Sequence, residues 1–476
     1  MGMWLLWLIV ALLLYVAQLA VILWLEHRRP AHMTAWLFIA FVCPIVGFIA
    51  YFILGSEFTR RKRVDPYKDE TMHFACRMSE QVKDAGDAGN AQLAEQKKLF
   101  AMLTALAPFP ITGRNKTTVL TDGRETFDSI LEELQQAKHH IHLDYYTIRD
   151  DEIGTRFLEV LVRKAREGVV IRVVYDGIGS LHLNEAYIAK LRKAGIQTTC
   201  FLPPRIAFFD RRLNFRNHRK IVVVDGKVGF IGGINIGDEY LGKDPKLGFW
   251  RDTHLKLEGD SVYFLQELFM NDWSFAAKEK LESAAYMPAN PCEYRERVQI
   301  VPSKPGHNDQ KIREVMFAAI TAASSRIYIT TPYFIPDPSL VMGLRTAALS
   351  GVDVRLIIPG PSDSKLVLLA TLSFIQEMLD AGVKVYRYEK GFVHAKVMIV
   401  DDMLAMIGTA NVDMRSLYSN FEINAVLFDE GTIRRLETDF MNDLQNSREL
   451  ALQEFKKRPK RQKTAESILY MLSPLL

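Results

Sequence analysis

The stretch that decides the fold runs from His218 to Asn235 and reads HRKIVVVDGKVGFIGGIN. Its spacing is H-x-K-x4-D-x6-G-G-x-N, and it returns between His394 and Asn411 with threonine in place of the second glycine. Each matched residue is displaced by the same number of positions, 394 − 218 = 176. Two copies in one register indicate an internal repeat rather than a chance match.

Each copy predicts a buried strand that presents an imidazole and an ammonium on one face. Residues 220–224 are branched and apolar, which is typical of a buried strand, and residues 396–400 repeat the pattern. Side chains two positions apart share a face of a strand, so the histidine and lysine of each copy point the same way. Each aspartate falls at an odd offset from its histidine, and we expect it to brace the following turn. The motif residues assigned to the catalytic unit are His218, Lys220, Asp225, His394, Lys396 and Asp401.

A tight turn and a glycine pair follow the first strand. Asp225-Gly226 predicts a turn into a second strand at 228–231. The glycine pair at 232–233 allows the backbone to approach a ligand closely, and the next amide side chain adds a donor. The candidate phosphate-binding residues are Gly233, Asn235, Thr409 and Asn411.

The net charge of +4 conceals two separate basic clusters. One is 60–63 and the other lies within 456–463, and without them the chain would be net acidic. A generally basic surface for nucleic acid is therefore not expected. The four cysteines form no C-x-x-C pair, which argues against a zinc site or a disulfide framework.

Two long uncharged segments near the N-terminus predict a transmembrane helical hairpin. Met3–Leu25 and Thr34–Leu54 carry no charge, and at about 1.5 Å per residue each spans about 30 Å of hydrocarbon. A cleaved signal peptide is the alternative for the first segment, but that segment lacks a basic n-region and its apolar run is too long. Two buried core helices are a further alternative, which the absence of a polar face disfavours.

The charges that flank the hairpin predict its orientation. The loop 26–33 carries Arg28 and Arg29, whereas the cluster 60–63 and Lys68 follow the second segment. By the positive-inside rule, this bias favours a multi-pass protein of the cell membrane whose C-terminal body is cytoplasmic.

Beyond a polar, helical connector, strands alternate with helices twice along the chain. The first round is a helix at 127–134, a strand at 141–148, a helix at 157–166 and a strand at 169–175. The second round is a helix at 312–320 and strands at 327–331 and 352–358. This order predicts an α/β fold with two copies of one domain. The expected divisions are the hairpin 1–57, the connector 58–108, the first domain 109–290 and the second domain with a basic tail 291–476.

Two further segments are candidates for contact with substrate or membrane. Residues 201–215 insert a proline-rich, aromatic and basic loop before the first motif. Such a loop is a candidate for substrate contact, and a surface loop without a functional role is an equally good interpretation. At the C-terminus the cluster 456–463 precedes an apolar end, which suggests contact with an anionic membrane surface. A disordered basic tail is the alternative there.

The repeated motif suits a phosphodiester better than a metal. A metal site would need carboxylates or several imidazoles converging on one point, and alternation splits the H-H-x-H run at 139–142 across two faces. On a phosphodiester, one neutral imidazole attacks phosphorus while the other protonates the leaving alkoxide, and ammoniums and amides hold the other oxygens. The two half-sites must then meet at one phosphate.

An attacking imidazole needs an acceptor on its other ring nitrogen to fix its tautomer. Asp252, in WRDTH, lies 252 − 218 = 34 positions after His218. Glu422, in NFE, lies 422 − 394 = 28 positions after His394. We therefore expect each carboxylate to orient the histidine of its own half, with ordinary ion pairing as the alternative.

These motifs resemble those of the phospholipase D superfamily. Together with the hairpin and the stretches GGINIGDEY, WRDTH and GTANVDMRS, they make the chain similar to the bacterial cardiolipin synthase family over essentially its full length. The resemblance implies two tandem phospholipase D-like domains, each a mixed sheet flanked by helices. It also implies transfer of a phosphatidyl group between two phosphatidylglycerols, giving cardiolipin and glycerol through a phosphohistidine, with no metal or other cofactor.

The resemblance further implies a role for each motif residue. His218 is the nucleophile, and His394 is the acid that then becomes the base. The residues that bind phosphate are Lys220, Lys396, Asn235 and Asn411, and those that orient the histidines are Asp252 and Glu422. The more usual G-S-x-N is altered in both copies, since Thr409 keeps a hydroxyl and Gly233 offers only backbone.

Three functions are compatible with the sequence. A phosphatidyltransferase and a phospholipase D hydrolase share the motif, because an alcohol or water can open a phosphohistidine. The hairpin favours transfer, since it holds the site where lipid alcohols are concentrated. A membrane-tethered nuclease is the third, and the acidic remainder of the chain argues against nucleic acid as a partner. The expected partners are membrane phospholipids, and a homo-oligomer is compatible with the sequence.

Overall fold

The computed structural model describes residues 2–26, 30–51, 70–80, 97–204, 215–306 and 310–475. Features of the sequence that lie outside these ranges include Arg28 and Arg29, the end of the second apolar segment at 52–54, the basic cluster 60–63 with Lys68, and residues 205–214 of the inserted loop.

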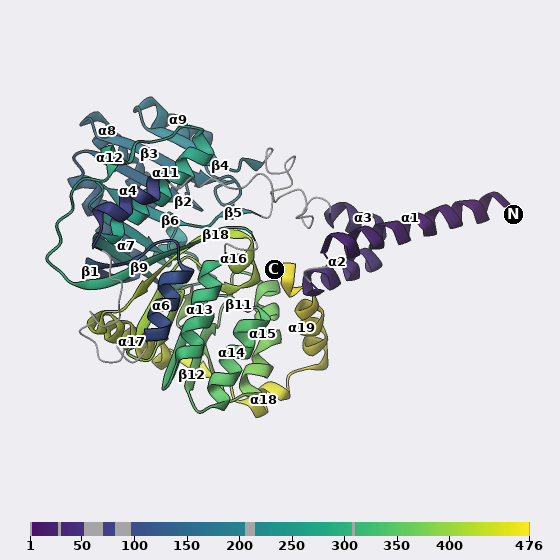
Figure 1. The fold of residues 1–476 in the computed structure, drawn as a ribbon. Helices are drawn as coiled ribbons and strands as arrows, with labels where there is room; N and C mark the ends of the chain where they lie inside the picture. Colours follow the sequence, from purple (N-terminus) through teal and green to yellow (C-terminus); the bar gives the residue numbers. More distant parts are fainter. Residues whose placement is uncertain are drawn as a thin grey trace.

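A single mixed sheet runs through both halves of the chain (Figure 1). The first half contributes β1 (Ile111–Asp122), β2 (His140–Tyr145), β3 (Val170–Asp176), β4 (Gln197–Phe201), β6 (Lys220–Val224), β7 (Val228–Gly232) and β8 (Phe249–Gly259). The second half contributes β9 (Glu296–Ser303), β10 (Arg326–Thr330), β12 (Asp353–Pro359), β13 (Lys384–Tyr388), β15 (Val397–Val400), β16 (Leu404–Gly408), β18 (Asn420–Leu427) and β19 (Ser447–Glu449).

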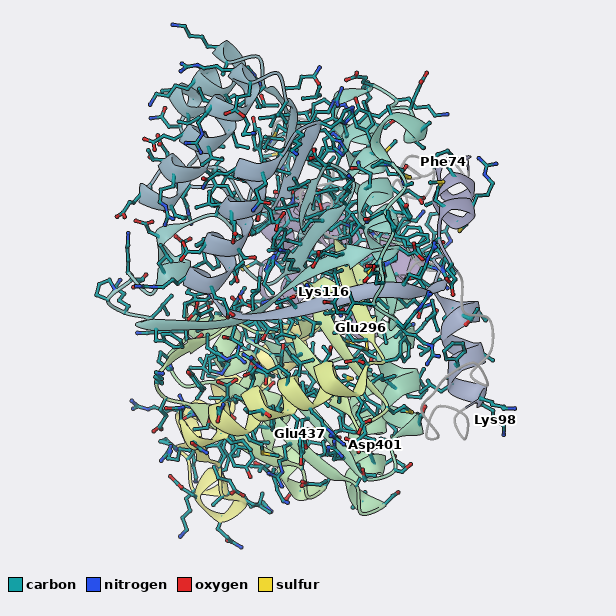
Figure 2. The ribbon with its side chains drawn as sticks, turned by 90° about the vertical axis from the view of Figure 1, so that its left-hand side faces the viewer. Phe74, Lys98, Lys116, Glu296, Asp401 and Glu437 are labelled. Atoms are coloured by element: carbon teal, nitrogen blue, oxygen red, sulfur yellow. The ribbon has the colours of Figure 1, made fainter. Side chains whose placement is uncertain are left out.

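The strand order shows that the two halves are copies of one unit. In the first half the order is β4-β3-β2-β6-β7-β8-β1, and in the second it is β13-β12-β10-β15-β16-β18-β9, with β19 beside β13. Matching strands pair in the same sense, parallel on the outer side and antiparallel toward the centre. The halves join where β1 pairs antiparallel with β9, and Figure 2 shows Lys116 and Glu296 on these two strands.

Helices cover the sheet on both faces and enclose three hydrophobic cores. Those of the first half are α7 (Gly123–Gln136), α8 (Glu152–Arg166), α9 (Glu185–Lys193), α11 (Ser261–Ala277) and α12 (Ser283–Tyr286). Those of the second half are α13 (Lys311–Ala322), α14 (Pro338–Leu349), α15 (Lys365–Asp380), α16 (Met414–Tyr418) and α17 (Glu430–Gln445). One core lies in each half, and the third spans both, from Phe264 on α11 to Phe440 on α17.

The strands and helices predicted from periodicity are present, with small shifts in their ends. Helix α7 begins where the polar signal predicts, because Asp122 caps it by accepting a hydrogen bond from Glu125 N at 2.8 Å. The Glu125 carboxylate accepts in turn from Thr121 N at 2.8 Å. The predicted turn after each motif strand also forms, since Asp225 and Asp401 both adopt positive φ, at 54° and 50°.

The two connector helices pack on different hydrophobic cores. Helix α4 (Glu70–Met78) places Ala75 in the core shared by both halves. Helix α6 (Lys97–Leu106) buries Leu99, Phe100 and Leu103 in the core of the second half. Figure 2 shows Phe74 and Lys98, one on each helix, along the same flank of the molecule. The connector therefore fastens both halves rather than merely linking the hairpin to them.

The N-terminal segments form one long helix and one interrupted helix. Helix α1 (Gly2–Glu26) projects from the body (Figure 1), and among the described residues only its span 3–26 is long and apolar enough to cross a membrane. The second helix, expected over 34–54, is interrupted within its described part: α2 (Pro30–Val42) ends before Cys43 and α3 (Pro44–Ala50) follows, while residues 52–54 lie outside the described ranges. Proline lacks an amide hydrogen and disfavours helical backbone in the preceding residue, which explains the break at Cys43.

The C-terminal segment is ordered and lies against the second half. It forms α18 (Leu452–Lys456), α19 (Lys460–Leu472) and the 3-10 helix η4 (Ser473–Leu475). Arg458 pairs with Glu466 at 2.7 Å, so part of the basic cluster is used in this packing. The alternative of a disordered tail is therefore wrong. Leu475 packs against the buried cluster of the N-terminal helices, which includes Trp36 and Tyr51.

Candidate active site

Two short strands carry each motif histidine from its own half into the other half. Strand β5 (Arg216–Asn217) pairs in parallel with the start of β18, and His218 N donates to Phe421 O at 3.0 Å. Strand β14 (Gly391–Val393) pairs in parallel with the start of β8, and His394 N donates to Arg251 O at 2.7 Å. The two-stranded pair β11 (Phe334–Ile335) and β17 (Val412–Asp413) lies nearby, in the second half.

Because the strands cross over, each histidine binds the carboxylate of the other half. His218 Nδ1 lies 3.0 Å from Glu422 Oε2, and His394 Nδ1 lies 2.8 Å from Asp252 Oδ2. The predicted pairing within each half is therefore wrong. Spacing along the chain suggested a partner in the same half. In the structure each histidine amide instead donates to a carbonyl on β18 or β8 of the other half, and the imidazole contacts the carboxylate of the next residue on that strand.

His394 is buried, His218 is partly buried, and both are neutral near pH 7. Burial lowers the pKa of His218 to about 4, against the opposing charge of Glu422, and burial with the charge of Lys396 lowers the pKa of His394 to about 4. Burial disfavours ionisation of Glu422, but His218 and Lys220 outweigh it and lower its pKa to about 2. An ionised carboxylate that accepts from Nδ1 fixes the ring proton there, which leaves Nε2 of His218 unprotonated and able to attack phosphorus.

The motif lysines lie behind the histidines. Lys220 Nζ donates to His218 O at 2.7 Å, and Lys396 Nζ donates to His394 O at 2.6 Å. Lys396 Nζ also lies 3.1 Å from His394 Nε2. Burial lowers the pKa of Lys220 to about 7 and that of Lys396 to about 8, partly offset by the carboxylates.

The motif asparagines line the same cavity as the histidines. Asn235 Nδ2 donates to the Tyr240 hydroxyl at 2.5 Å, and Asn235 Oδ1 accepts from Thr147 N at 3.1 Å. Asn411 Nδ2 donates to Asp413 Oδ2 at 2.9 Å. Protein contacts therefore orient both amides at the cavity wall.

Gly233 and Thr409 do not face the cavity, and this corrects their prediction as phosphate-binding residues. The Thr409 hydroxyl is buried and donates to Glu422 Oε2 at 2.5 Å. A Cβ on Gly233 would lie 2.2 Å from Asp252 Oδ1. The residue at this position therefore acts on the carboxylate that binds a histidine. In one half the Thr409 hydroxyl donates to Glu422, and in the other the lack of a side chain at Gly233 leaves room for Asp252.

Asp225 and Asp401 lie at the far ends of their strands, outside the cavity. Asp225 accepts from the backbone amides of Lys138, His139 and His140 at 2.8–2.9 Å. Asp401 accepts from the amides of residues 324–326 at 2.7–2.9 Å. Both aspartates belong to the sequence motif, but they do not line the cavity. Their contacts brace the turn, as the odd offset indicated.

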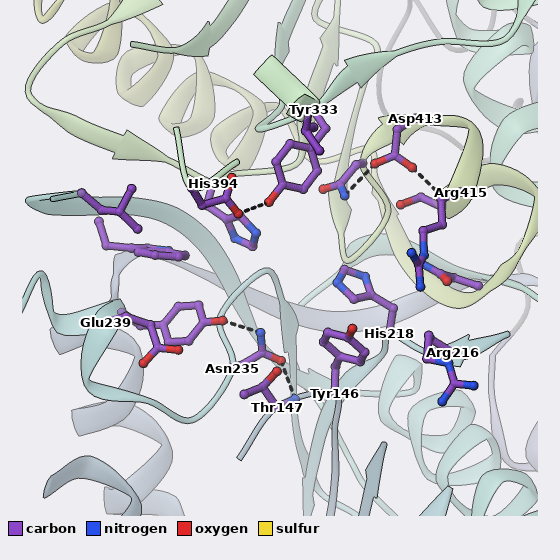
Figure 3. A pocket seen from close by; sticks show the side chains of 18 of the residues that line it. Tyr146, Thr147, Arg216, His218, Asn235, Glu239, Tyr333, His394, Asp413 and Arg415 are labelled. Atoms are coloured by element: carbon purple, nitrogen blue, oxygen red, sulfur yellow. Dashed lines mark hydrogen bonds between the residues drawn. The ribbon is translucent and has the colours of Figure 1, made fainter. Parts of the chain in front are cut away.

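Both half-sites open into one cavity of about 670 Å³ (Figure 3). Cationic side chains lie on the His218 side, where Figure 3 shows Arg216 and Arg415. Tyr333 lies beside His394, and its ring centroid is 6.4 Å from the imidazole centroid. Further lining residues that the sequence did not identify include Tyr146, Thr147, Arg149, Glu239, Tyr240, Asp363, Asp413 and Leu475. They come from loops, from the two-residue strand β17 and from short helices such as the 3-10 helix η3 (Asp238–Leu241), which are too short to show periodicity.

The arrangement has the donor set for a phosphate and not that for a metal. Within the described ranges, no group of three or more His, Cys, Asp or Glu side chains could hold a metal ion. His140 and His142 of the H-H-x-H run instead share Gln266 as a buried partner, at 3.0 and 3.2 Å. Two neutral imidazoles and two amides line one cavity, and each motif lysine donates to the carbonyl of its histidine. This set is suited to acid–base and nucleophilic chemistry on an anion.

Comparisons with known proteins agree with this fold. The family described as "Cardiolipin synthase, PLD-like domain" matches residues 130–259 and 316–444. The crystal structure of phosphatidylserine synthase from Haemophilus influenzae has the same fold, with a TM-score of 0.62 and 15% identity, covering 80% of this chain and 100% of that one. The fold is therefore that of a tandem phospholipase D-like protein.

Relatives narrow this class to one family. Cardiolipin synthase 2 of Bacillus anthracis is 44% identical over 457 residues, which cover 96% of this chain and 89% of that protein. Cardiolipin synthase of Geobacillus kaustophilus is 43% identical over 460 residues, covering 96% and 91%. The chain belongs to the cardiolipin synthase family, phosphatidyltransferases of the phospholipase D superfamily that are associated with membranes.

Proposed function

We propose that the protein condenses two phosphatidylglycerol molecules into cardiolipin and glycerol. The observation that carries this proposal is the crossed arrangement of His218 with Glu422 and His394 with Asp252 around one cavity. Each carboxylate orients one imidazole and fixes its tautomer, and the two imidazoles act on one phosphate. The names of the relatives point to the same product.

In the first step His218 attacks the phosphorus of the donor lipid through Nε2. Its Nδ1 proton is donated to Glu422 at 3.0 Å, so the positive charge that develops on the ring is stabilised. His394 protonates the departing glycerol oxygen. An anionic phosphate beside His394 raises the pKa of this imidazole, so binding of the lipid favours the protonated His394 that this step requires.

In the second step the headgroup of another phosphatidylglycerol opens the phosphohistidine. His394, now neutral, accepts the proton of the attacking hydroxyl, and the bond between His218 Nε2 and phosphorus breaks. Lys220, Lys396, Asn235 and Asn411 hold the non-bridging oxygens throughout, because charge moves between the phosphate oxygens in both steps. Arg216 and Arg415 give one side of the cavity a positive potential suited to anionic lipids.

The membrane arrangement is part of the proposal. We infer a multi-pass hairpin formed by α1 and the interrupted α2–α3 segment, with the catalytic domains on the cytoplasmic side. Leu475 supports the closeness of the cavity to these helices, because it lines the cavity and also packs on the cluster of the N-terminal helices. The cavity therefore opens close to the segments that would lie in the bilayer.

A product assay tests the function. Purified protein in phosphatidylglycerol micelles, without added divalent metal, should give cardiolipin and glycerol in equal amounts. Phosphatidic acid without cardiolipin would move the function to a phospholipase D hydrolase that uses water as the acceptor. His218→Ala is the matched inactive control and should give neither product.

A further inference from the structure

The cavity is symmetric in its motif residues but asymmetric in the side chains that surround them. Glu239 is four positions after Asn235, and Arg415 is four positions after Asn411, so opposite charges occupy matching places. On the His218 side Arg216 and Arg415 line the wall, whereas Tyr333 lies beside His394 (Figure 3). The two sides therefore offer different chemistry to the groups attached to the central phosphorus.

Asp363 is one of the cavity-lining carboxylates that the mechanism above does not use. It lies in the loop between β12 and α15, is exposed, and lines the cavity. Its charge is close enough to help raise the pKa of His394 and of Lys396, although burial still lowers both overall. Among the described residues it pairs with no cation, so it does not serve as an ordinary ion-pair partner.

Tyr333 holds Asp363 in place. The Tyr333 hydroxyl makes a short hydrogen bond to Asp363 Oδ2. Burial, followed by the charge of Asp363, raises the pKa of Tyr333 well above its usual value, so the phenol stays protonated and donates. Within the described ranges nothing engages Asp363 Oδ1, which leaves one carboxylate oxygen available to a ligand donor.

In-line displacement determines which part of the lipid reaches Asp363. With His218 as nucleophile, the departing glycerol oxygen lies on the opposite side of phosphorus, beside His394. The attacking headgroup of the second lipid enters along the same line. A glycerol headgroup carries a neighbouring hydroxyl, which is a hydrogen-bond donor suited to a carboxylate.

We propose that Asp363, positioned by Tyr333, binds the hydroxyl next to the reacting oxygen of glycerol and so selects a glycerol headgroup as leaving group and as acceptor. The proposal rests on the proposed function. In the transfer step the glycerol oxygen forms the new bond to phosphorus, the bond from His218 Nε2 breaks, and the hydroxyl proton passes to His394. The Asp363 carboxylate keeps its charge and only accepts the neighbouring hydrogen bond.

A partition experiment tests this inference. The enzyme, in phosphatidylglycerol micelles, is given labelled glycerol and propan-1-ol together, and the yields of labelled phosphatidylglycerol and phosphatidylpropanol are compared. Both alcohols compete for one phosphohistidine, so their ratio does not depend on how fast that intermediate forms. Propan-1-ol lacks the second hydroxyl and serves as the reference acceptor.

Asp363→Ala should lower the ratio of glycerol to propanol product at least tenfold, and Tyr333→Phe should lower it less. Asp380→Asn, the same charge change at the exposed end of α15, should leave the ratio unchanged. If Asp363 acted only through the pKa of His394, both products would fall equally. A ratio that Asp363→Ala leaves unchanged would therefore overturn the proposal. Absence of both products from the wild-type enzyme would instead refute the proposed function.

Discussion

Replacing Glu422 by glutamine should impair His218, although the two residues lie 422 − 218 = 204 positions apart in different halves. The substitution removes the charge from a buried acceptor 3.0 Å from His218 Nδ1. A buried hydrogen bond to a charged group contributes about 1.5–3 kcal/mol. If that energy is lost in the transition state, attack on phosphorus slows roughly 10- to 150-fold.

A donor lipid with a p-nitrophenol headgroup isolates this step, because its leaving group needs no proton from His394. The release of p-nitrophenol in the first turnover then reports attack by His218 alone. Glu422→Gln should slow this burst by the stated factor. Asp252→Asn should leave the burst nearly intact and slow the later turnovers, because Asp252 serves His394. Glu132→Gln, an exposed carboxylate elsewhere, is the matched control.

The reverse result would refute the crossed arrangement. If Asp252→Asn slowed the burst and Glu422→Gln spared it, each carboxylate would serve the histidine of its own half. The double variant Glu422→Gln, Asp252→Asn gives an independent check: its burst should be about as slow as that of Glu422→Gln alone, because Asp252 does not contact His218.

Three further predictions follow from the site. Gly233→Ala should lower turnover at least tenfold with the fold retained, because the new Cβ would lie 2.2 Å from Asp252 Oδ1; Gly431→Ala on α17 is the control, and wild-type turnover of Gly233→Ala would contradict the contact. Thr409→Val should lower turnover several-fold and Thr409→Ser should restore it, since the hydroxyl lies 2.5 Å from Glu422; equal rates for both variants would argue against this role. Stability should fall as the pH drops from 6.5 toward 4, because the folded-state pKa values of His140, His218 and His394 are lowered from 6.5 to about 4, so the unfolded chain binds protons first. At pH 5 each shift costs about 2 kcal/mol, and a melting temperature in detergent that is constant or rises over this range would contradict the buried neutral state.

The sequence predicted the parts of the fold that depend on local pattern. Apolar runs at 220–224 and 397–400 became strands, the polar signal at Asp122 became a helix cap, and Asp225-Gly226 became a turn. The repeat also predicted two α/β domains of one kind. These features follow from side-chain alternation and backbone preference, which act over a few residues.

The sequence did not predict contacts set by strand pairing between the halves. The order of residues along the chain does not reveal that β5 pairs with β18 and β14 with β8, so the partners of the two histidines were assigned to the wrong carboxylates. Asp363 and Tyr333 lie in loops without periodic pattern. Pro44, by contrast, was a readable signal for the break in the second apolar helix.

The most direct test of the central claim is to locate the covalent intermediate. The His394→Ala variant, mixed with the p-nitrophenol lipid, quenched and digested, should carry a phosphatidyl group on the peptide that contains His218. Mass spectrometry identifies the modified residue, and the double variant His218→Ala, His394→Ala provides the blank. A phosphatidyl group on His218 is the predicted result, whereas no adduct, or an adduct on another residue, would contradict the mechanism.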